Sequence, residues 1–390
     1  MTSSATSLGS PLGVAAARSA RLAVALVFLV NGTVLANWVS RIPAIQQGLG
    51  LSEGILGFAL LGAAVGALFS MPTAGWLISR IGSRLVTIGS GLCYCVALPG
   101  LAFAPNLPIF MLSLTLFGAC NGAMDIAMNA QAAAVEERYR RPIMSSFHGL
   151  FSVGGMIGAL MGGAAAAQGL GPRTHLSVVA VVLAGVFVLA VRGLLPSSVD
   201  SRSSGPAFAR PGRTLLGLGL LTFCVMLGEG AMADWSAVYL DGTLGTSEAY
   251  AALGFGAFAV TMALGRLSGD WLSQRFGVVT LLRAGGIVST VGLAAALLIG
   301  TPTAALNGFA CAGAGYSVGV PLALSVAGRD SRMAPGPAIA AVATVGYFGF
   351  LVGPPVIGLV AELASLRVGL AVVVVLSAVY GLLAGTAART

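Results

Sequence analysis

The stretch that decides the fold is residues 116–138, LFGACNGAMDIAMNAQAAAVEER, an apolar run with a regular row of polar side chains. Asn121, Asp125 and Asn129 follow at intervals of four residues, and Glu136 continues near the same line. At helical spacing they share one face, with about 6 Å of rise between neighbours. A carboxyl group inside a membrane helix is costly against lipid, so we expect Asp125 to face other helices or a water-filled space. The alternative is a packing helix whose polar groups bond to nearby backbone.

Composition identifies the lipid bilayer as the solvent for most of the chain. Of the 390 residues, 57% are hydrophobic and 8% are charged, whereas soluble domains carry about 25% charged residues. The 56 glycines and the apolar runs of about 20 residues indicate closely packed helices and not a β-barrel. We therefore expect an all-α polytopic membrane protein. The five cysteines fall inside apolar runs and show no disulfide or metal-binding spacing.

Twelve apolar segments are long enough to cross about 30 Å of hydrocarbon. Their approximate bounds are 20–41, 54–78, 85–104, 107–136, 144–167, 174–195, 214–240, 249–273, 279–300, 304–327, 337–361 and 368–388. Residues 1–17 form a Ser/Ala/Gly-rich tail that we expect to be disordered and cytoplasmic. Residues 196–213, rich in Ser, Pro, Gly and Arg, predict a cytoplasmic linker between two six-helix bundles, 18–195 and 214–390.

The distribution of charge predicts the orientation of these segments. All 20 basic residues are arginines. If the N-terminus is cytoplasmic, only Arg41, Arg173 and Arg367 fall in external connections, which is a strong positive-inside bias. The formal charge of +8 is then a signal of topology and not of nucleic-acid binding. We predict that both termini are cytoplasmic.

The two halves repeat one another. Trp76-Leu-Ile-Ser-Arg80-Ile-Gly82 matches Trp271-Leu-Ser-Gln-Arg275-Phe-Gly277, about half a chain length later. Asn37-Trp38 matches Asp234-Trp235 at nearly the same separation. Because these matches keep a nearly constant offset, we expect two homologous six-helix bundles.

The repeated bundles and the Gly75-x-x-x-(polar)-Arg80-x-Gly82 loop resemble the major facilitator superfamily over essentially the whole chain from Arg18. Segments 31–43, 141–151 and 229–235 resemble a bacterial branch that includes rhizopine-transport-like proteins. The resemblance implies two pseudo-symmetric six-helix bundles that work by alternating access in the cytoplasmic (inner) membrane of a bacterium. We expect a monomer in the lipid bilayer.

The loop after the second span departs from the superfamily pattern. In that pattern an acidic residue precedes the arginine and helps to hold the cytoplasmic side shut, but here the position is Ser79. We predict that Arg80, the tight turn at Gly82, and an Asp270/Arg275 pair in the second copy form the cytoplasmic gate. The alternative is that these arginines only mark the cytoplasmic interface.

Three acids lie well inside predicted spans: Asp125, Glu229 and Asp234. The resemblance implies a substrate site near the membrane midplane between the halves, so our leading site pairs Asp125 with Glu229 across a cavity, with the asparagines of the polar row beside them. Asp234 lies nearer the outer end and is a candidate for an outer gate with Asn37. Burial disfavours a charged carboxyl, which makes these acids candidate proton acceptors.

Other polar residues extend this candidate site. His148 in the fifth span and Tyr347 at the matching place in the eleventh lie at core positions, and a histidine there either titrates or makes a structural hydrogen bond. Tyr316 takes the place of Asp125 in the second half and is a candidate to stack on or hydrogen-bond a ligand. His175, beside an external loop, is expected to be solvated.

These observations predict a proton-coupled secondary transporter for a small polar organic solute. We identify no arginine near the midplane to pair with an anion, so the carboxylates favour a cation or a polyol. One alternative is a drug or metabolite efflux antiporter, because Gly154, Gly158 and Gly162 resemble an antiporter motif without its proline. Another is a membrane sensor that does not transport. We find no nucleophile with a base, no metal cluster and no nucleotide motif, and so expect no enzyme activity, cofactor or metal.

Overall fold

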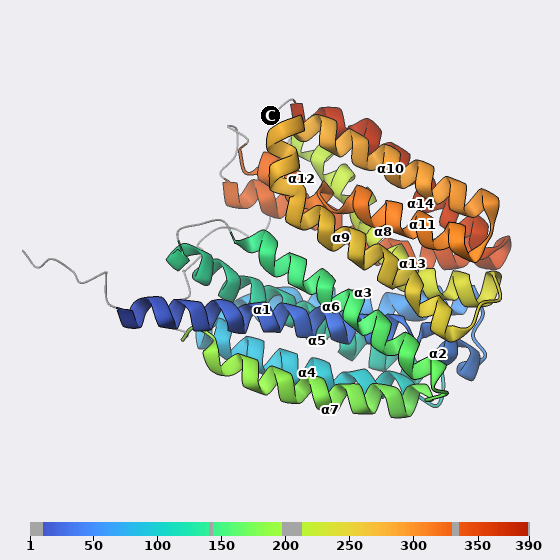
Figure 1. The fold of residues 1–390 in the computed structure, drawn as a ribbon, viewed down its shortest axis with the longest axis horizontal. Helices are drawn as coiled ribbons and strands as arrows, with labels where there is room; N and C mark the ends of the chain where they lie inside the picture. Colours follow the sequence, from blue (N-terminus) through green and yellow to red (C-terminus); the bar gives the residue numbers. More distant parts are fainter. Residues whose placement is uncertain (1–10, 140–142, 197–212, 330–334, 389–390) are drawn as a thin grey trace, which may run out of the picture.

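The computed structural model describes residues 11–139, 143–196, 213–329 and 335–388 (Figure 1). Most of the predicted linker, residues 197–212, and residues 1–10 of the predicted tail lie outside the described residues. The rest of that tail is helical, because the first helix begins at Pro11. The prediction of a disordered segment up to residue 17 is therefore wrong for residues 11–17.

The first half contains seven helices within the described part of the chain. They are α1 Pro11–Val39, α2 Ile42–Leu49, α3 Glu53–Ile81, α4 Ser83–Phe103, α5 Leu107–Tyr139, α6 Met144–Ala167 and α7 Pro172–Ala190. The second half adds α8 Arg213–Val238, α9 Glu248–Phe276, α10 Val278–Ile299, α11 Pro302–Tyr316, α12 Gly319–Ala327, α13 Pro335–Leu363 and α14 Leu366–Leu383. Twelve spans are long and apolar enough to cross a membrane, which confirms the predicted number.

Two of the twelve spans are broken, which the sequence analysis did not anticipate. The first is divided into α1 and α2, and the tenth into α11 and α12. Pro43 and Pro321 follow the breaks. A proline lacks an N–H and its ring clashes with the carbonyl group four residues earlier. Those carbonyls belong to Val39 and Ser317, where α1 ends and where α11 has just ended.

The halves form two layers in Figure 1, α1–α7 below and α8–α14 above. Within the first, α1 packs on α6 and α3 on α5; within the second, α8 packs on α13 and α9 on α11. Between the layers, α6 packs on α9 and α3 packs on α13. The second span of each half thus packs against the fifth span of the other half. This is expected for a repeat related by a pseudo-two-fold axis.

The repeated loop has the same backbone geometry in both halves. Gly82 has φ 87° between α3 and α4, and Gly277 has φ 79° between α9 and α10. Only glycine adopts such values without strain, which explains why the repeat keeps this residue. We call the end of the molecule that holds these two turns and the first residues of α1 the linker end. The opposite end, which holds α2, is the α2 end (Figure 1).

Candidate functional site

A cluster of polar side chains lies near mid-length between the two halves. Asp125 of α5 accepts a hydrogen bond from Tyr347 of α13, at 3.4 Å between Oδ2 and the hydroxyl oxygen. Asn129 donates its amide to the carboxyl Oδ1 of Asp125 at 3.1 Å and to the backbone oxygen of the same residue at 2.8 Å. Asp125 therefore faces the other half, as the polar row predicts.

A second part of the cluster is an ion pair in the second half. Arg266 of α9 lies 3.2 Å from Oε2 of Glu229 on α8. Another guanidinium nitrogen of Arg266 donates to the Ser152 hydroxyl of α6 at 3.3 Å, which crosses to the first half. The side chains of Arg266 and Glu229 are 13% and 17% exposed, and Oε1 of Glu229 has no hydrogen-bond partner within the described residues. One carboxylate oxygen of the ion pair is thus a buried acceptor that the described residues leave unsatisfied.

Tyr347 lies between the two parts of the cluster, and His148 lies beside the second part. Tyr347 lies close enough to both Asp125 and Glu229 to interact electrostatically with each. The His148 ring makes an edge contact with Phe28, with 5.3 Å between ring centroids, and its backbone oxygen accepts a bond from the Ser152 hydroxyl. The predicted Asp125/Glu229 pair is therefore indirect, because Tyr347 lies near both acids and each acid has its own partner.

Arg266 is the residue that the sequence analysis missed. We identified no arginine near the midplane, and that expectation is wrong because Arg266 bonds to Glu229. The sequence did place Arg266 well inside the predicted span 249–273, and this position alone indicated an arginine near the midplane. Its meaning depends on Glu229, which belongs to a different helix, so only the packing of α8 on α9 reveals the pair.

Four predicted site residues lie outside this hydrogen-bonded cluster: Asn121, Asp234, Tyr316 and Asn37, the last of which belongs to the network at the α2 end described below. Asn121 and Asp234 are half-buried and make no side-chain hydrogen bond to the described part of the chain. Tyr316 is 1% exposed and its hydroxyl bonds to Ser377 of α14. Its ring is thus enclosed in the second half, and the structure gives no support to a ligand-stacking role.

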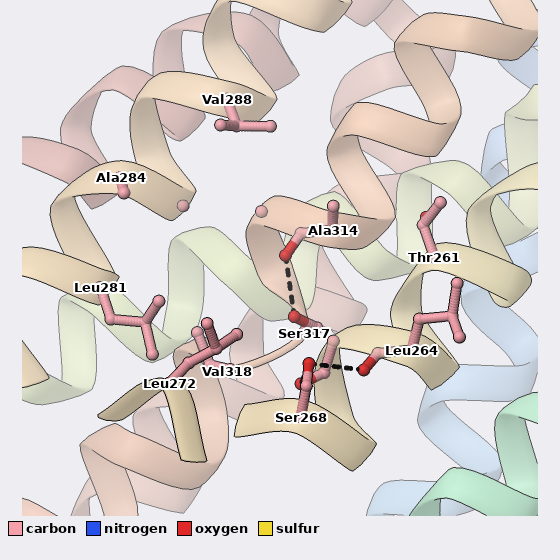
Figure 2. Close-up of a pocket in the computed structure, with 13 residues that line it drawn as sticks. Thr261, Leu264, Ser268, Leu272, Leu281, Ala284, Val288, Ala314, Ser317 and Val318 are labelled. Carbon is pink, nitrogen blue, oxygen red and sulfur yellow. Dashed lines mark hydrogen bonds between the residues drawn. The ribbon is translucent and has the colours of Figure 1, made fainter. Parts of the chain in front are cut away.

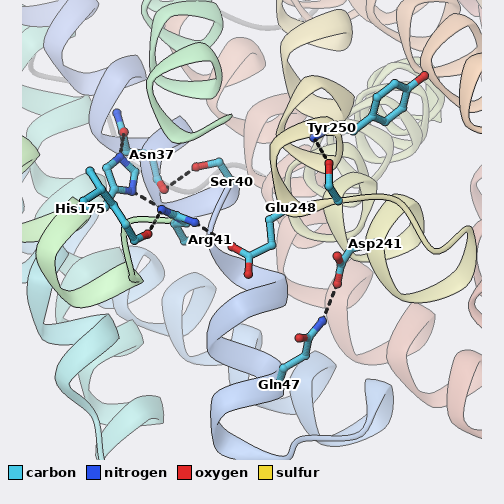
Figure 3. A network of polar contacts seen from close by, with 10 residues as sticks. Asn37, Ser40, Arg41, Gln47, His175, Asp241, Glu248 and Tyr250 are labelled. Carbon is cyan, nitrogen blue, oxygen red and sulfur yellow. Dashed lines mark hydrogen bonds and ion pairs between the residues drawn. The ribbon is translucent and has the colours of Figure 1, made fainter. Parts of the chain in front are cut away.

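A separate polar network closes the α2 end (Figure 3). Arg41, between α1 and α2, forms an ion pair with Glu248 of α9 at 2.7 Å. Its Nε donates to Nδ1 of His175 on α7 at 3.0 Å, and its third nitrogen donates to the backbone oxygen of Leu170. The Nε2 of His175 lies 2.9 Å from Oδ1 of Asn37. We call Arg41, His175 and Glu248 the α2-end latch.

This network corrects two expectations. His175 is 4% exposed and is not solvated; Arg41 lies in the connection where we placed it but is 1% exposed. Asn37 bonds to His175, so the proposed partnership of Asn37 with Asp234 is not formed. Two further bonds join the halves at this end: Gln47 donates to Asp241, and the Gly54 amide donates to Glu362.

The charged residues predicted for the cytoplasmic gate are exposed at the linker end, whereas Gly82, in the turn between α3 and α4, is buried. Arg80 stacks on its neighbour Trp76, with 4.7 Å from the guanidinium carbon to the ring centroid, and Arg275 lies 6.0 Å from the Trp271 ring. Asp270 is also exposed, and the predicted Asp270/Arg275 ion pair is not formed in this structure. Within the described residues, side-chain hydrogen bonds between the halves lie at the α2 end or in the central cluster.

A pocket of about 320 Å³ lies between α9, α10 and α11 (Figure 2). Its lining is apolar apart from a few hydroxyl groups, and Leu264 and Val288 on its rim are exposed. The pocket belongs to the second half alone, and none of the predicted site residues lines it. We therefore do not assign the solute site to this pocket.

The comparison with protein families agrees with the paired halves. The model of the Major Facilitator Superfamily matches residues 22–335. The chain belongs to the major facilitator superfamily. The superfamily and fold predictions are therefore confirmed, and the central cluster lies in a membrane transporter.

Similar transporters extend over nearly the whole chain. An uncharacterised MFS-type transporter of Yersinia pestis is 37% identical over 92% of this chain and 93% of its own length. An uncharacterised transporter of Sinorhizobium fredii is 36% identical over 93% of this chain and 96% of its own length. The membrane protein MosC of Rhizobium meliloti is 36% identical over 88% of this chain and 84% of its own length. Their names specify no substrate.

Solved structures of the superfamily share the fold. An inward-facing, unoccupied bacterial homologue of the human lysosomal transporter Spinster superimposes with a TM-score of 0.74, at 17% identity, over 98% of this chain and 99% of its own. The nucleoside transporter NupG gives 0.70 at 12% identity, over 95% and 98%. At this identity the likeness concerns the fold alone.

Proposed function

We propose that this protein is a proton-coupled secondary transporter that moves a small polar organic solute across a bacterial cytoplasmic membrane by alternating access. The observation that carries the proposal is the central cluster, in which half-buried Asp125, Glu229 and Arg266 lie at mid-length where the halves meet. Charged groups at that depth are costly unless they serve a pathway or binding site. No redox or hydrolytic chemistry is required of them.

The charges of the cluster favour a class of solute. Arg266 is balanced by Glu229, so Asp125 is the acid without a cationic partner among the described residues. Asp125 and the free Oε1 of Glu229 accept hydrogen bonds from a solute. These acceptors favour a hydroxylated or cationic solute over an anion, and Arg266 adds a donor for a carbonyl or hydroxyl oxygen.

The orientation belongs to the same proposal. Most arginines of the described residues lie at the linker end, which the positive-inside rule places in the cytoplasm, and the α2 end then faces outward. Under this assignment the α2-end latch closes the outer side, and the structure corresponds to an inward-facing state. Import driven by protons and export by antiport use the same architecture, and the central carboxyl groups serve as the proton acceptors in either direction.

The proposal is tested with purified protein in liposomes. A thermal-shift screen of sugars, inositol derivatives, amines and antibiotics identifies a ligand, since binding to the folded state raises the melting temperature. Counterflow of that labelled ligand is then measured with and without a pH gradient. Transport requires counterflow, whereas binding without counterflow indicates a sensor.

Variants of the acids test the site itself. We expect Asp125→Asn and Glu229→Gln each to abolish or strongly reduce proton-driven accumulation, because each removes an acceptor that can bind a proton or the solute. Glu137→Gln, an exposed acid near the end of α5, is the matched control and should transport normally. Unaltered proton-dependent flux in both central variants would reject the site.

A further inference from the structure

The donors and acceptors around His175 allow only one protonation state. Arginine has no acceptor, so Arg41 Nε donates its hydrogen to Nδ1 of His175, which must carry a lone pair. Asn37 uses its amide nitrogen to donate to the Thr33 backbone oxygen at 2.8 Å. Its Oδ1 is therefore an acceptor, and Nε2 of His175 supplies the hydrogen. The imidazole in the closed latch is neutral.

A proton on Nδ1 is incompatible with this arrangement. It would place an N–H of a cationic ring against the N–H of a buried guanidinium at a separation of 3.0 Å. Like charges at that distance repel strongly where water is scarce, and Arg41 is 1% exposed. Closure of the latch and protonation of His175 therefore exclude each other.

We propose that His175 is a proton-binding site that controls the α2-end latch. The neutral imidazole holds Arg41 in place on Glu248 and keeps the two halves together at this end. The protonated imidazole repels Arg41, which weakens the Arg41–Glu248 ion pair and allows the halves to separate.

The other groups packed around His175 do not supply an alternative acceptor. The α6 helix presents Gly162, where a Cβ would lie 3.8 Å from the ring, and α1 presents the Asn37 amide. Glu248 of α9 is bonded to Arg41. Arg173, in the same first turn of α7, points toward α4, where it donates to the Ala102 backbone oxygen. Arg41 is thus the charged group in contact with the ring.

The inference deepens the proposed function and rests on it for its physiological meaning. If the α2 end faces outward, acid outside the cell favours the outward-open state, and loss of the proton favours closure. The pH dependence has a definite sign: the closed latch predominates at higher pH and is lost as pH falls through the range in which the imidazole titrates. Inward movement of protons is then coupled to a cycle that loads solute from outside.

The test measures the separation of the halves directly. Gly48 and Gly242 are exposed, belong to opposite halves near this end, and a Cβ at either meets nothing within 4 Å. Cysteines at these positions carry spin labels, in a background where Cys93 and Cys311, the two native cysteines that are not buried, are serine. Electron–electron double resonance in nanodiscs is recorded at about pH 8 and about pH 5, the range in which histidine changes charge.

We expect a short label distance at the higher pH and a growing long-distance population at the lower pH. In His175→Asn the side-chain oxygen accepts from Arg41 but binds no proton in this range, so the short distance should persist at both values. Glu137→Gln is the control and should retain the pH-dependent change, because this exposed acid near the end of α5 belongs to neither the latch nor the central cluster. A pH-independent distance in the unaltered histidine background overturns the proposal. A pH-dependent change that survives in His175→Asn or disappears in Glu137→Gln overturns it as well.

A second variant tests the proposal even if His175→Asn does not fold. Glu248 is 40% exposed at its side chain, so Glu248→Gln should fold normally. It weakens the closed latch without touching His175, so the midpoint of opening should move to higher pH. An unchanged midpoint contradicts the coupling. None of these measurements requires a solute, so they test the latch independently of transport. If the halves separate with pH but the protein shows no counterflow, the proposed transport is refuted while the proposed role of His175 still holds.

Discussion

At the scale of single residues, the ion pair of Glu229 and Arg266 constrains the central cluster most. Two charges in a water-poor interior are stabilised by one another, and removal of one partner leaves the other buried and uncompensated. The bond from Arg266 to Ser152 also joins the pair to the opposite half. The pair therefore contributes to the stability of the second half and to a contact between the halves that would change in the proposed alternating access.

A double-mutant cycle separates these two contributions. We expect Arg266→Gln to lower the free energy of unfolding by about 3 kcal/mol, because it leaves Glu229 without its cation. In Arg266→Gln/Glu229→Gln both charges are gone, so much of the stability should return while transport stays absent. Thermal denaturation and counterflow are measured on each variant. Recovery of transport in the double variant would show that the pair is structural only.

The sequence predicted the acids of the site better than their partners. Asp125 was identified because an ionisable residue in a polar row cannot face lipid, and it bonds to Tyr347 across the interface. Arg266 and His175 were misjudged because their environment is supplied by helices distant in the sequence. Apolar patterning predicts depth in the membrane but carries no information on which side chain lies opposite.

At the scale of helices, glycines determine how closely α6 approaches its neighbours. Gly154 faces α1, where a Cβ would lie 3.0 Å from the backbone nitrogen of Thr33, and Gly158 faces Ala36 of the same helix. On the other side of α6, Gly155 and Gly163 face α9 of the second half. Small residues at such crossings allow backbones to pack closely where lipid provides no hydrophobic driving force.

Substitution at these glycines tests the close packing. Gly154→Ala places a methyl group against the α1 backbone, so we expect the melting temperature in detergent to fall, with a cost of about 1–3 kcal/mol. Gly89→Ala is the matched control, because a Cβ there meets nothing within 4 Å, and alanine favours the helix. A Gly154→Ala protein as stable as the control would show that α6 can move away from α1 without loss.

The helices were predicted almost completely, and the failures have local causes. All twelve spans were anticipated because about 20 apolar residues are required to cross the bilayer. The breaks before α2 and α12 were not, although Pro43 and Pro321 were visible signals. Other prolines lie inside continuous helices, such as Pro354 and Pro355 in α13, so a proline alone does not predict a break.

At the scale of the whole molecule, the packing between halves supports the rocking movement that the proposed alternating access requires. The α6/α9 and α3/α13 contacts are related by the internal repeat, so they form a pair of similar surfaces about which the halves can rotate. Side-chain bonds across the interface hold the α2 end together, while Arg80 and Arg275 at the linker end are exposed. In the proposed cycle, the α2 end opens when these bonds break, and the linker end closes where the predicted gate residues lie.

A reversible crosslink tests whether this movement is obligatory. Gln47 and Asp241 bond to each other across the halves at the α2 end, so a short bifunctional thiosulfonate reagent can join the cysteines of Gln47→Cys/Asp241→Cys. We expect the crosslink to stop counterflow and a reductant, which cleaves its disulfide bonds, to restore it, because a link at this end prevents the outward-open state. The single variants, treated with the same reagent, control for loss of the native bond. Full transport with the crosslink formed would mean that the solute passes without separation of the halves here, and the alternating-access assignment would then be wrong.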